Sequence, residues 1–151
     1  MLKGISPLLN ADVLHALRSM GHGDDLVVAD ANFPADALAR RTTLGRLLRI
    51  DNVPITDAVA AILSVFPLDT FVEDAAARMQ VVGRPDEIPA VQQDVQTVLD
   101  RALGRASPMV GIERHAFYAR AEKAYCVIQT GERRFYADFA FRKGVIGPDA
   151  G

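Results

Sequence analysis

Apolar residues follow two alternating spacings along this chain, one typical of helices and the other of buried strands. From residue 13 to residue 20 they recur on one face of a helix, which Asn10 caps at its start and the left-handed conformation of Gly21 ends. The run from Leu26 to Ala29 is short and continuously apolar, which is typical of a strand covered on both faces in a parallel sheet. The pattern therefore predicts a helix, a loop and a buried strand in that order.

The rest of the chain repeats this alternation. Thr56 is the expected cap of one helix, and Pro89 and Gly104 mark the start and end of another. Strands are predicted over residues 46–50, 78–82, 108–112, 125–129 and 139–142, and helices over 56–66, 89–103 and 114–123. Strands that alternate with helices favour an α/β fold. We expect one three-layer domain over residues 1–151, with a largely parallel sheet flanked by helices.

Length and charge exclude several classes of function. The 151 residues carry 17 Lys and Arg against 19 Asp and Glu, so the chain lacks the basic character that binds nucleic acid. Its most apolar stretch, residues 58–63, is far shorter than the ~18 residues of a membrane span. A proline and polar residues interrupt any signal-peptide core in residues 1–10. We expect a soluble cytoplasmic protein with no nucleic-acid or membrane partner.

Cysteine and histidine are too few and too scattered for a metal centre. Cys126, the only cysteine, lies in a predicted strand and has no thiol partner, so a buried and inert thiol is expected. His15 is expected to lie off the apolar stripe of its helix and His115 neighbours Arg114 in a charged segment, so both are expected to be solvated. No metal ligand set is therefore assigned.

A histidine and a carboxylate bracket the first strand. His22 stands between two glycines just before the strand, and Asp30 stands where it stops. Imidazole titrates near neutral pH, so His22 is a candidate general acid or base; alternatively its loop is a simple turn and the ring bonds only to backbone. Asp30 is either a turn-forming residue or an acceptor for the hydroxyl group of a polyol. The residues alone leave both alternatives open.

The two candidates lie at opposite ends of one strand. Ligands of parallel sheets bind beyond the carboxyl ends of the strands, so Asp30 is expected to face a site. His22 reaches that site only if its loop folds back or if a neighbouring subunit supplies it.

Two later segments carry further candidates. Arg114 precedes Phe117 and Tyr118 in a predicted helix, where it is either a surface residue of an amphipathic helix with Phe117 in the core or a binding residue. Residues 131–138 form an exposed loop that is either an oligomer contact or the rim of a pocket.

These motifs together resemble a known family. The segments that carry the likeness are residues 2–9, 20–24, 29–34, 117–118, 130–133 and 143–145. They are similar to the L-fucose mutarotase and D-ribose pyranase family, and the start Ile-Ser-Pro-Leu, the Gly-His-Gly-Asp motif and the Asn-Phe-Pro turn are closer to the fucose branch. The resemblance implies that the chain interconverts the α and β anomers of a free monosaccharide, L-fucose or a related pyranose, without a cofactor.

The resemblance also assigns roles to particular residues. It implies that His22 is the proton donor and that Asp30 and Arg114 bind the sugar. Residues Tyr136, Ala137 and Asp138 align with a Tyr-Gly-Asn segment of the family that contacts the substrate. Asp138 departs from that pattern, because an ionised carboxylate only accepts hydrogen bonds whereas an amide also donates them.

Finally, the family assembles as rings, commonly two stacked pentamers, with sites between adjacent subunits. The resemblance thus implies a homo-oligomer, a ring-shaped decamer, in which a neighbouring chain brings residues 136–138 to a pocket that holds His22 and Asp30 of the first chain. The alternative function is that of a non-catalytic sugar-binding or sugar-transport accessory protein, which would share the polar pocket.

Overall fold

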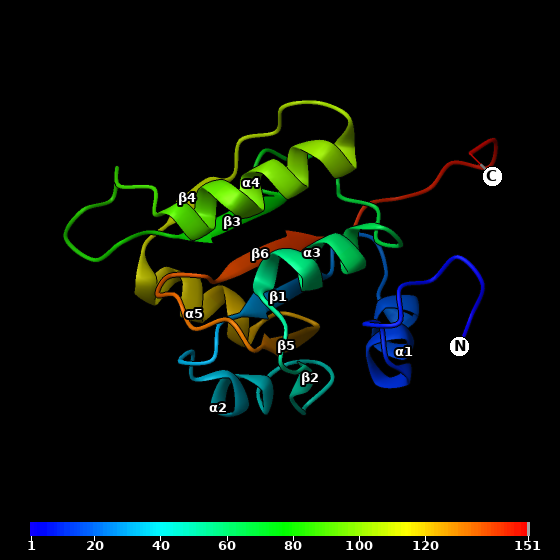
Figure 1. Cartoon of the computed structure of the whole chain (residues 1–151), viewed down its shortest axis with the longest axis horizontal. Coiled ribbons are helices and arrows are strands. Elements are labelled where there is room, and N and C mark those ends of the chain that lie inside the picture. Colours follow the sequence, from blue (N-terminus) through cyan, green and yellow to red (C-terminus); the bar gives the residue numbers. More distant parts are fainter. Residues whose placement is uncertain (151) are drawn as a thin grey trace.

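The computed structural model describes residues 1–150, which form five helices and six strands (Figure 1). The helices are α1 (Ala11–Ser19), α2 (Ala35–Ala39), α3 (Ile55–Leu63), α4 (Ala90–Leu103) and α5 (Arg114–Glu122). The strands are β1 (Asp25–Ala29), β2 (Leu48–Ile50), β3 (Ala76–Met79), β4 (Val110–Ile112), β5 (Cys126–Thr130) and β6 (Phe139–Arg142).

All six strands form one sheet in the order β2-β5-β1-β6-β3-β4. The pairs β1 with β5, β2 with β5 and β3 with β4 are parallel, whereas β6 is antiparallel to both of its neighbours, β1 and β3. In register, Val28 of β1 lies opposite Phe139 of β6. Because β6 runs against the other strands, its first residues lie at the edge of the sheet where the other strands end. That edge holds the candidate site.

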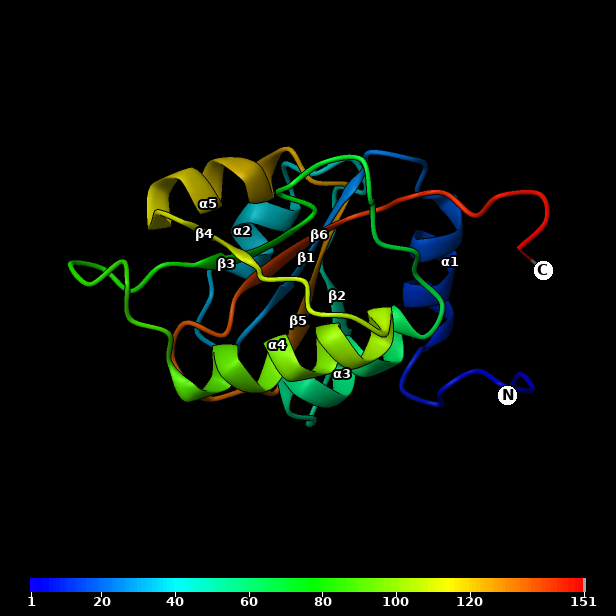
Figure 2. The same ribbon diagram turned by 90° about the horizontal axis from the view of Figure 1, so that it is seen from above.

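Helices cover both faces of the sheet, as Figure 2 shows, with α3 and α4 on one side and α2 and α5 on the other. On the side of α3 and α4, the core also contains Val13 and Leu17 of α1. On the side of α2 and α5, the core contains Phe117 of α5. Packing on both faces accounts for the continuously apolar sequence of β1. The predicted α/β fold, with a mostly parallel sheet between helices, is confirmed.

Local details of the turns differ from the sequence-based expectations. The chain leaves α1 in an extended conformation at Met20, and Gly23, not Gly21, takes the left-handed conformation (φ 88°). Its N–H then bonds to the carbonyl of Lys143, 2.9 Å away. Helix α3 begins after Pro54, so Thr56 lies inside the first turn and is not the cap. Gly104 does end α4 in the left-handed conformation, as predicted.

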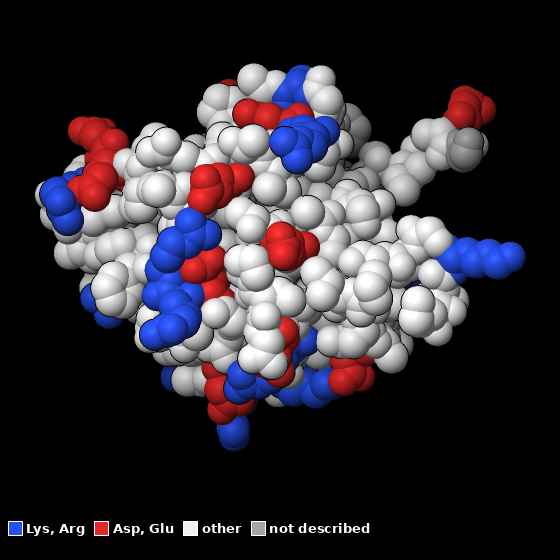
Figure 3. Space-filling view, viewed as in Figure 1, with Lys and Arg blue, Asp and Glu red and all other residues white. Residues whose placement is uncertain are grey.

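Charges of both signs are mixed on the face shown in Figure 3. Arg134, for example, pairs with Asp94 at 2.8 Å. Within residues 1–150, none of the helices is long and apolar enough to cross a bilayer.

A buried glutamate anchors the loop between β5 and β6. Glu132 is 6% exposed, and one of its oxygens accepts the N–H groups of Arg133 and Arg134, each at 2.9 Å. Its other oxygen accepts the Nη2 of Arg134 at 3.0 Å and the N–H of Ile55 at 3.3 Å, which caps α3. The Glu132 carboxylate thus links residues of the loop to one another and to the start of α3.

The Glu132 carboxylate is expected to make folding acid-sensitive. Hydrogen bonds from Arg134 lower the pKa of Glu132 from the ordinary 4.5 to about 2. A depressed folded-state pKa stabilises the fold above the unfolded-state value, and that stability is lost as the pH falls from about 4.5 towards 2. Glu132→Gln should therefore lower the free energy of unfolding at neutral pH and reduce its decline in acid, measured by denaturant titration across pH. A variant that declines in acid as steeply as wild type would contradict this. Glu73→Gln, which changes an exposed glutamate in the same way, is the matched control.

Candidate functional site

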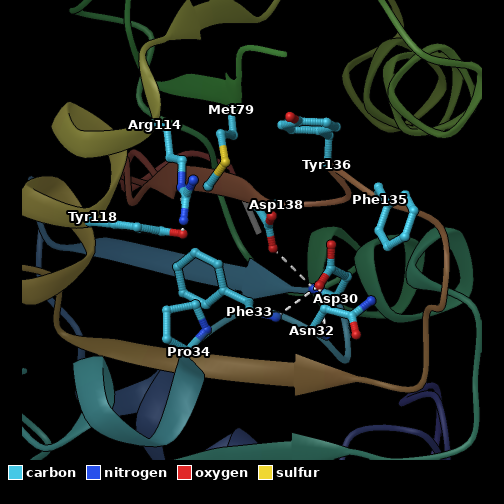
Figure 4. A pocket seen from close by; sticks show the side chains of 10 residues that line it. All are labelled: Asp30, Asn32, Phe33, Pro34, Met79, Arg114, Tyr118, Phe135, Tyr136 and Asp138. Atoms are coloured by element: carbon cyan, nitrogen blue, oxygen red, sulfur yellow. Dashed lines mark hydrogen bonds between the residues drawn. The ribbon is translucent and has the colours of Figure 1, made fainter. Parts of the chain in front are cut away.

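A cavity of about 310 Å³ opens at the edge where β1 and β3 end and β6 begins (Figure 4). Residues from separate parts of the chain line it. They are Asp30, Asn32, Phe33 and Pro34 after β1, Met79 of β3, Arg114 and Tyr118 of α5, and Phe135, Tyr136 and Asp138 before β6. Asp30 thus borders the cavity at the carboxyl end of β1, where it was expected to face a site.

Asp30 shapes its own turn and also lines the cavity. Its side chain is buried, and Oδ1 accepts the N–H groups of Asn32 and Phe33 at 2.8 and 2.9 Å. Its Oδ2 accepts the N–H of Ala137 at 3.3 Å, so Ala137 contributes its backbone rather than its buried side chain. Burial raises the pKa of Asp30, and these three N–H groups oppose that rise. Asp30 therefore forms the turn and also lines the cavity, and its role as an acceptor for a sugar hydroxyl stays a prediction.

Asp138 lies directly beside Asp30 in the cavity. It is 4% exposed, and its Oδ1 accepts the backbone N–H of Asp30 at 3.1 Å. Figure 4 shows the two side chains pointing towards each other. Burial and the neighbouring charge of Asp30 hold the pKa of Asp138 well above its usual range.

An arginine and a tyrosine from α5 border the same cavity. Arg114 is exposed, its Nε donates to the hydroxyl of Tyr118 at 3.0 Å, and its guanidinium lies 5.4 Å from the centre of the Tyr118 ring. Phe117, by contrast, is fully buried. Helix α5 is therefore amphipathic, and its exposed arginine still faces the cavity.

The loop before β6 holds Tyr136 in an unusual backbone conformation. Tyr136 has φ 62°, in the left-handed region, and its hydroxyl accepts the N–H of Val82 at 3.3 Å. Its carbonyl accepts Nε2 of Gln92, which also donates to the carbonyl of Met79. Gln92 is fully buried on the inner face of α4, and sequence reasoning missed it because only the folded chain places this amide beside the loop.

His22 lies away from this cavity, at the amino end of β1. Its Nε2 is 3.1 Å from Oδ2 of Asp69, and its ring meets that of Phe71 edge to face at 5.7 Å. Asp69 is only 5% exposed, whereas nearly half of the His22 side chain is exposed. The N–H of Phe71 and the imidazole both lower the pKa of Asp69. Nothing in the sequence distinguished Asp69 from other loop carboxylates, since its partner lies 47 residues away.

The structure therefore groups the predicted residues differently from the expected arrangement. Asp30, Arg114 and residues 136–138 meet within one chain, because β6 is antiparallel to β1 and starts where β1 ends. The expectation that a neighbouring chain brings residues 136–138 to Asp30 is wrong. His22 alone stands apart, at the other end of the strand.

The arrangement suits a small polyhydroxylated ligand. Carboxyl oxygens accept hydrogen bonds from hydroxyl groups, a guanidinium donates to them, and phenol groups do both. No group of three His, Cys, Asp or Glu side chains that could hold a metal ion is found in the described part of the chain. Cys126 is fully buried, and burial raises the pKa of its thiol to about 12, in agreement with the expected inert thiol.

A single α/β domain with carboxyl, guanidinium and phenol groups around one cavity defines a protein with a polar small-molecule site. The chain belongs to the RbsD / FucU transport protein family, whose model matches residues 3–146. This confirms the resemblance seen in the sequence.

Individual relatives match nearly the full chain. The fucose mutarotase of Homo sapiens is 40% identical over 148 residues, which cover 96% of this chain and 94% of the relative. The crystal structure of protein Atu2016 superposes with a TM-score of 0.95 at 58% identity and covers 97% of both chains. The crystal structure of the fucose mutarotase from Streptococcus pneumoniae in complex with L-fucose has a TM-score of 0.86 at 34% identity, over 97% of this chain and 100% of that one.

Proposed function

We propose that this protein is a mutarotase that interconverts the α and β anomers of a free monosaccharide, L-fucose or a related pyranose. The cavity that joins Asp30, Arg114 and Asp138 carries the proposal, since its groups are those that bind sugar hydroxyls. Similarity to a fucose mutarotase crystallised with L-fucose supports this choice of sugar.

The chemistry needs proton transfer and no cofactor. In ring opening, the ring oxygen gains a proton while the anomeric hydroxyl loses one; the free aldehyde then rotates and the ring closes on its other face. An imidazole serves as donor or acceptor near neutral pH, and His22 is the residue that we assign to this step. Asp30, Arg114 and the segment Tyr136 to Asp138 would bind the sugar hydroxyls.

His22 would reach the sugar from a neighbouring copy of the chain. It lies at the end of β1 remote from the cavity, so its own chain does not place it beside Asp30. Phe71 beside it and Phe135 at the cavity are 71% and 73% exposed, and aromatic side chains are enriched at the interfaces between proteins. A ring in which each His22 meets the cavity of the next subunit satisfies both observations. The ring-shaped decamer and the cytoplasmic location are part of this proposal.

Exchange between the two anomers in NMR spectra tests the activity. Catalytic amounts of the protein are expected to speed exchange between α- and β-L-fucose, and a panel of other aldoses would identify the preferred sugar. A non-catalytic sugar-binding or transport accessory protein would instead show saturable sugar binding with no faster exchange, and that result would refute the mutarotase assignment.

Asp69 is expected to matter through its contact with His22. If the Nε2–H of His22 donates to Asp69, Nδ1 is the nitrogen left to exchange protons with the sugar. In Asp69→Asn the amide would donate to Nε2 and favour the other tautomer. The maximal exchange rate should fall by at least about tenfold while the KM for the sugar stays near that of wild type. Asp12→Asn, an exposed carboxylate on α1, is the control; an unchanged rate in Asp69→Asn would argue against the role.

A further inference from the structure

Two carboxyl groups share the bottom of the cavity with very different sets of partners. Asp30 accepts three backbone N–H groups, from Asn32, Phe33 and Ala137. Asp138 accepts only one, the N–H of Asp30 itself. Both side chains are buried, at 3% and 4% exposure. Backbone N–H groups thus stabilise the ionised form of Asp30 more than they stabilise the ionised form of Asp138.

Among the described residues, no cation is paired with either carboxyl group. Across residues 1–150, neither Asp30 nor Asp138 forms an ion pair with Lys, Arg or His. Arg114 lines the cavity but directs its Nε to the hydroxyl of Tyr118. Two adjacent buried carboxylates without a counterion are costly to ionise together, so such pairs hold one proton between them.

We propose that Asp138 carries this proton and that, as a neutral acid, it donates a hydrogen bond to a hydroxyl group of the bound sugar. The identity of the ligand rests on the proposed function. Hydrogen-bond partners decide the placement of the proton, because the three N–H groups around Asp30 stabilise its ionised form and only one does so at Asp138. A neutral carboxyl group both donates and accepts hydrogen bonds. Neutral Asp138 can therefore make the same kinds of hydrogen bond as the amide that the family pattern has at this position.

The surroundings of Asp138 agree with this assignment. Burial comes first among the causes that raise its pKa, and the charge of Asp30 comes next. Glu132 adds a further negative charge near Asp30, although Arg134 pairs with it. The titratable or charged groups that face the pair, element by element, are Glu132 and Tyr136 of the loop before β6 and Arg114 and Tyr118 of α5.

Sugar affinity should therefore depend on pH in a defined direction. The neutral form of Asp138 is present below its pKa, and loss of the proton removes the donor and adds a buried negative charge. Affinity is expected to fall as the pH rises through that pKa, by up to about tenfold per pH unit.

The carboxyl carbon of Asp138 reports its protonation state directly. Its signal in ¹³C NMR spectra of the labelled protein is assigned by comparison with Asp138→Asn. The chemical shift is expected to stay that of a neutral acid up to a pH well above the range in which aspartate ordinarily titrates. Titration near pH 4, where a free aspartate titrates, would overturn the proposal. This readout needs no activity, so it separates a failure of this inference from a failure of the mutarotase assignment.

The dissociation constant of L-fucose then tests the consequence for binding. Wild-type protein and the control Asp12→Asn should bind about tenfold more weakly one pH unit above the measured titration than one unit below it. Asp138→Asn cannot lose its donor, so its two values should agree, whatever their size. If the acid stays neutral to the highest pH at which the protein is folded, Asp138→Ala should bind more weakly than Asp138→Asn throughout. If Asp138 titrates while the protein is folded, equal pH dependence in wild type and Asp138→Asn would refute the proposal. If it does not titrate there, equal affinity of the alanine and asparagine variants would refute it.

Discussion

His22→Ala is expected to slow the anomer exchange of L-fucose by about a hundred- to ten-thousandfold, the range that general acid or base catalysis contributes. The side chain is nearly half exposed, so the main cost of its loss is the hydrogen bond to the buried Asp69, and the free energy of unfolding should fall by only about 1 kcal/mol. Sugar affinity should also change little, since the groups assigned to binding line the cavity at the far end of β1. The exchange rate and the dissociation constant, both measured by NMR, separate these effects.

His15 and His115 provide matched controls, because both are exposed histidines. Alanine at either position should leave the exchange rate at the wild-type level. Wild-type exchange by His22→Ala would remove this residue from the reaction.

Asp30→Ala has the second largest expected effect, on sugar binding. The substitution removes a carboxylate of the cavity and also leaves the N–H groups of Asn32, Phe33 and Ala137 without their acceptor. An unsatisfied buried donor costs about 1–3 kcal/mol, so stability should fall by at least about 2 kcal/mol. A domain of ordinary stability survives that loss, which allows sugar binding to be measured on folded protein. We expect no detectable binding of L-fucose.

Arg114→Ala separates the loss of binding from the loss of stability. Arg114 is exposed and its side-chain bond is to Tyr118, so its removal should weaken sugar binding with little change in Tm. Tight L-fucose binding by folded Asp30→Ala would contradict the assignment of the cavity.

The fold was largely predictable from the sequence because its signals are local. The apolar run of β1, the helical spacing of α4 and its stop at Gly104 all depend on near neighbours. Helix α2 was missed, since its five residues are too few to show a helical period. The antiparallel direction of β6 was also missed, because strand direction depends on pairing with β1 and β3, which lie far away in the sequence.

From residue patterns alone, the candidate site was predictable only at Asp30, which follows a strand. Arg114, Tyr136 and Asp138, which line the same cavity, were assigned through the family resemblance. The rule for the carboxyl ends of parallel strands placed Asp30 correctly at the cavity. Asp69 and Gln92 were missed because each acts through a contact formed only on folding, with His22 and with the loop of Tyr136. The direction of β6 likewise decides that Asp138 adjoins Asp30 in the same chain.

The most direct test of the account mixes two inactive variants. If each site combines His22 of one copy with Asp30 of the next, a ring assembled from equal amounts of His22→Ala and Asp30→Ala chains contains sites with both native residues. Random assembly makes these about a quarter of all sites, so co-expressed chains should recover about a quarter of the wild-type rate of L-fucose anomer exchange. Co-assembled chains that remain as inactive as the separate variants would contradict a site shared between copies.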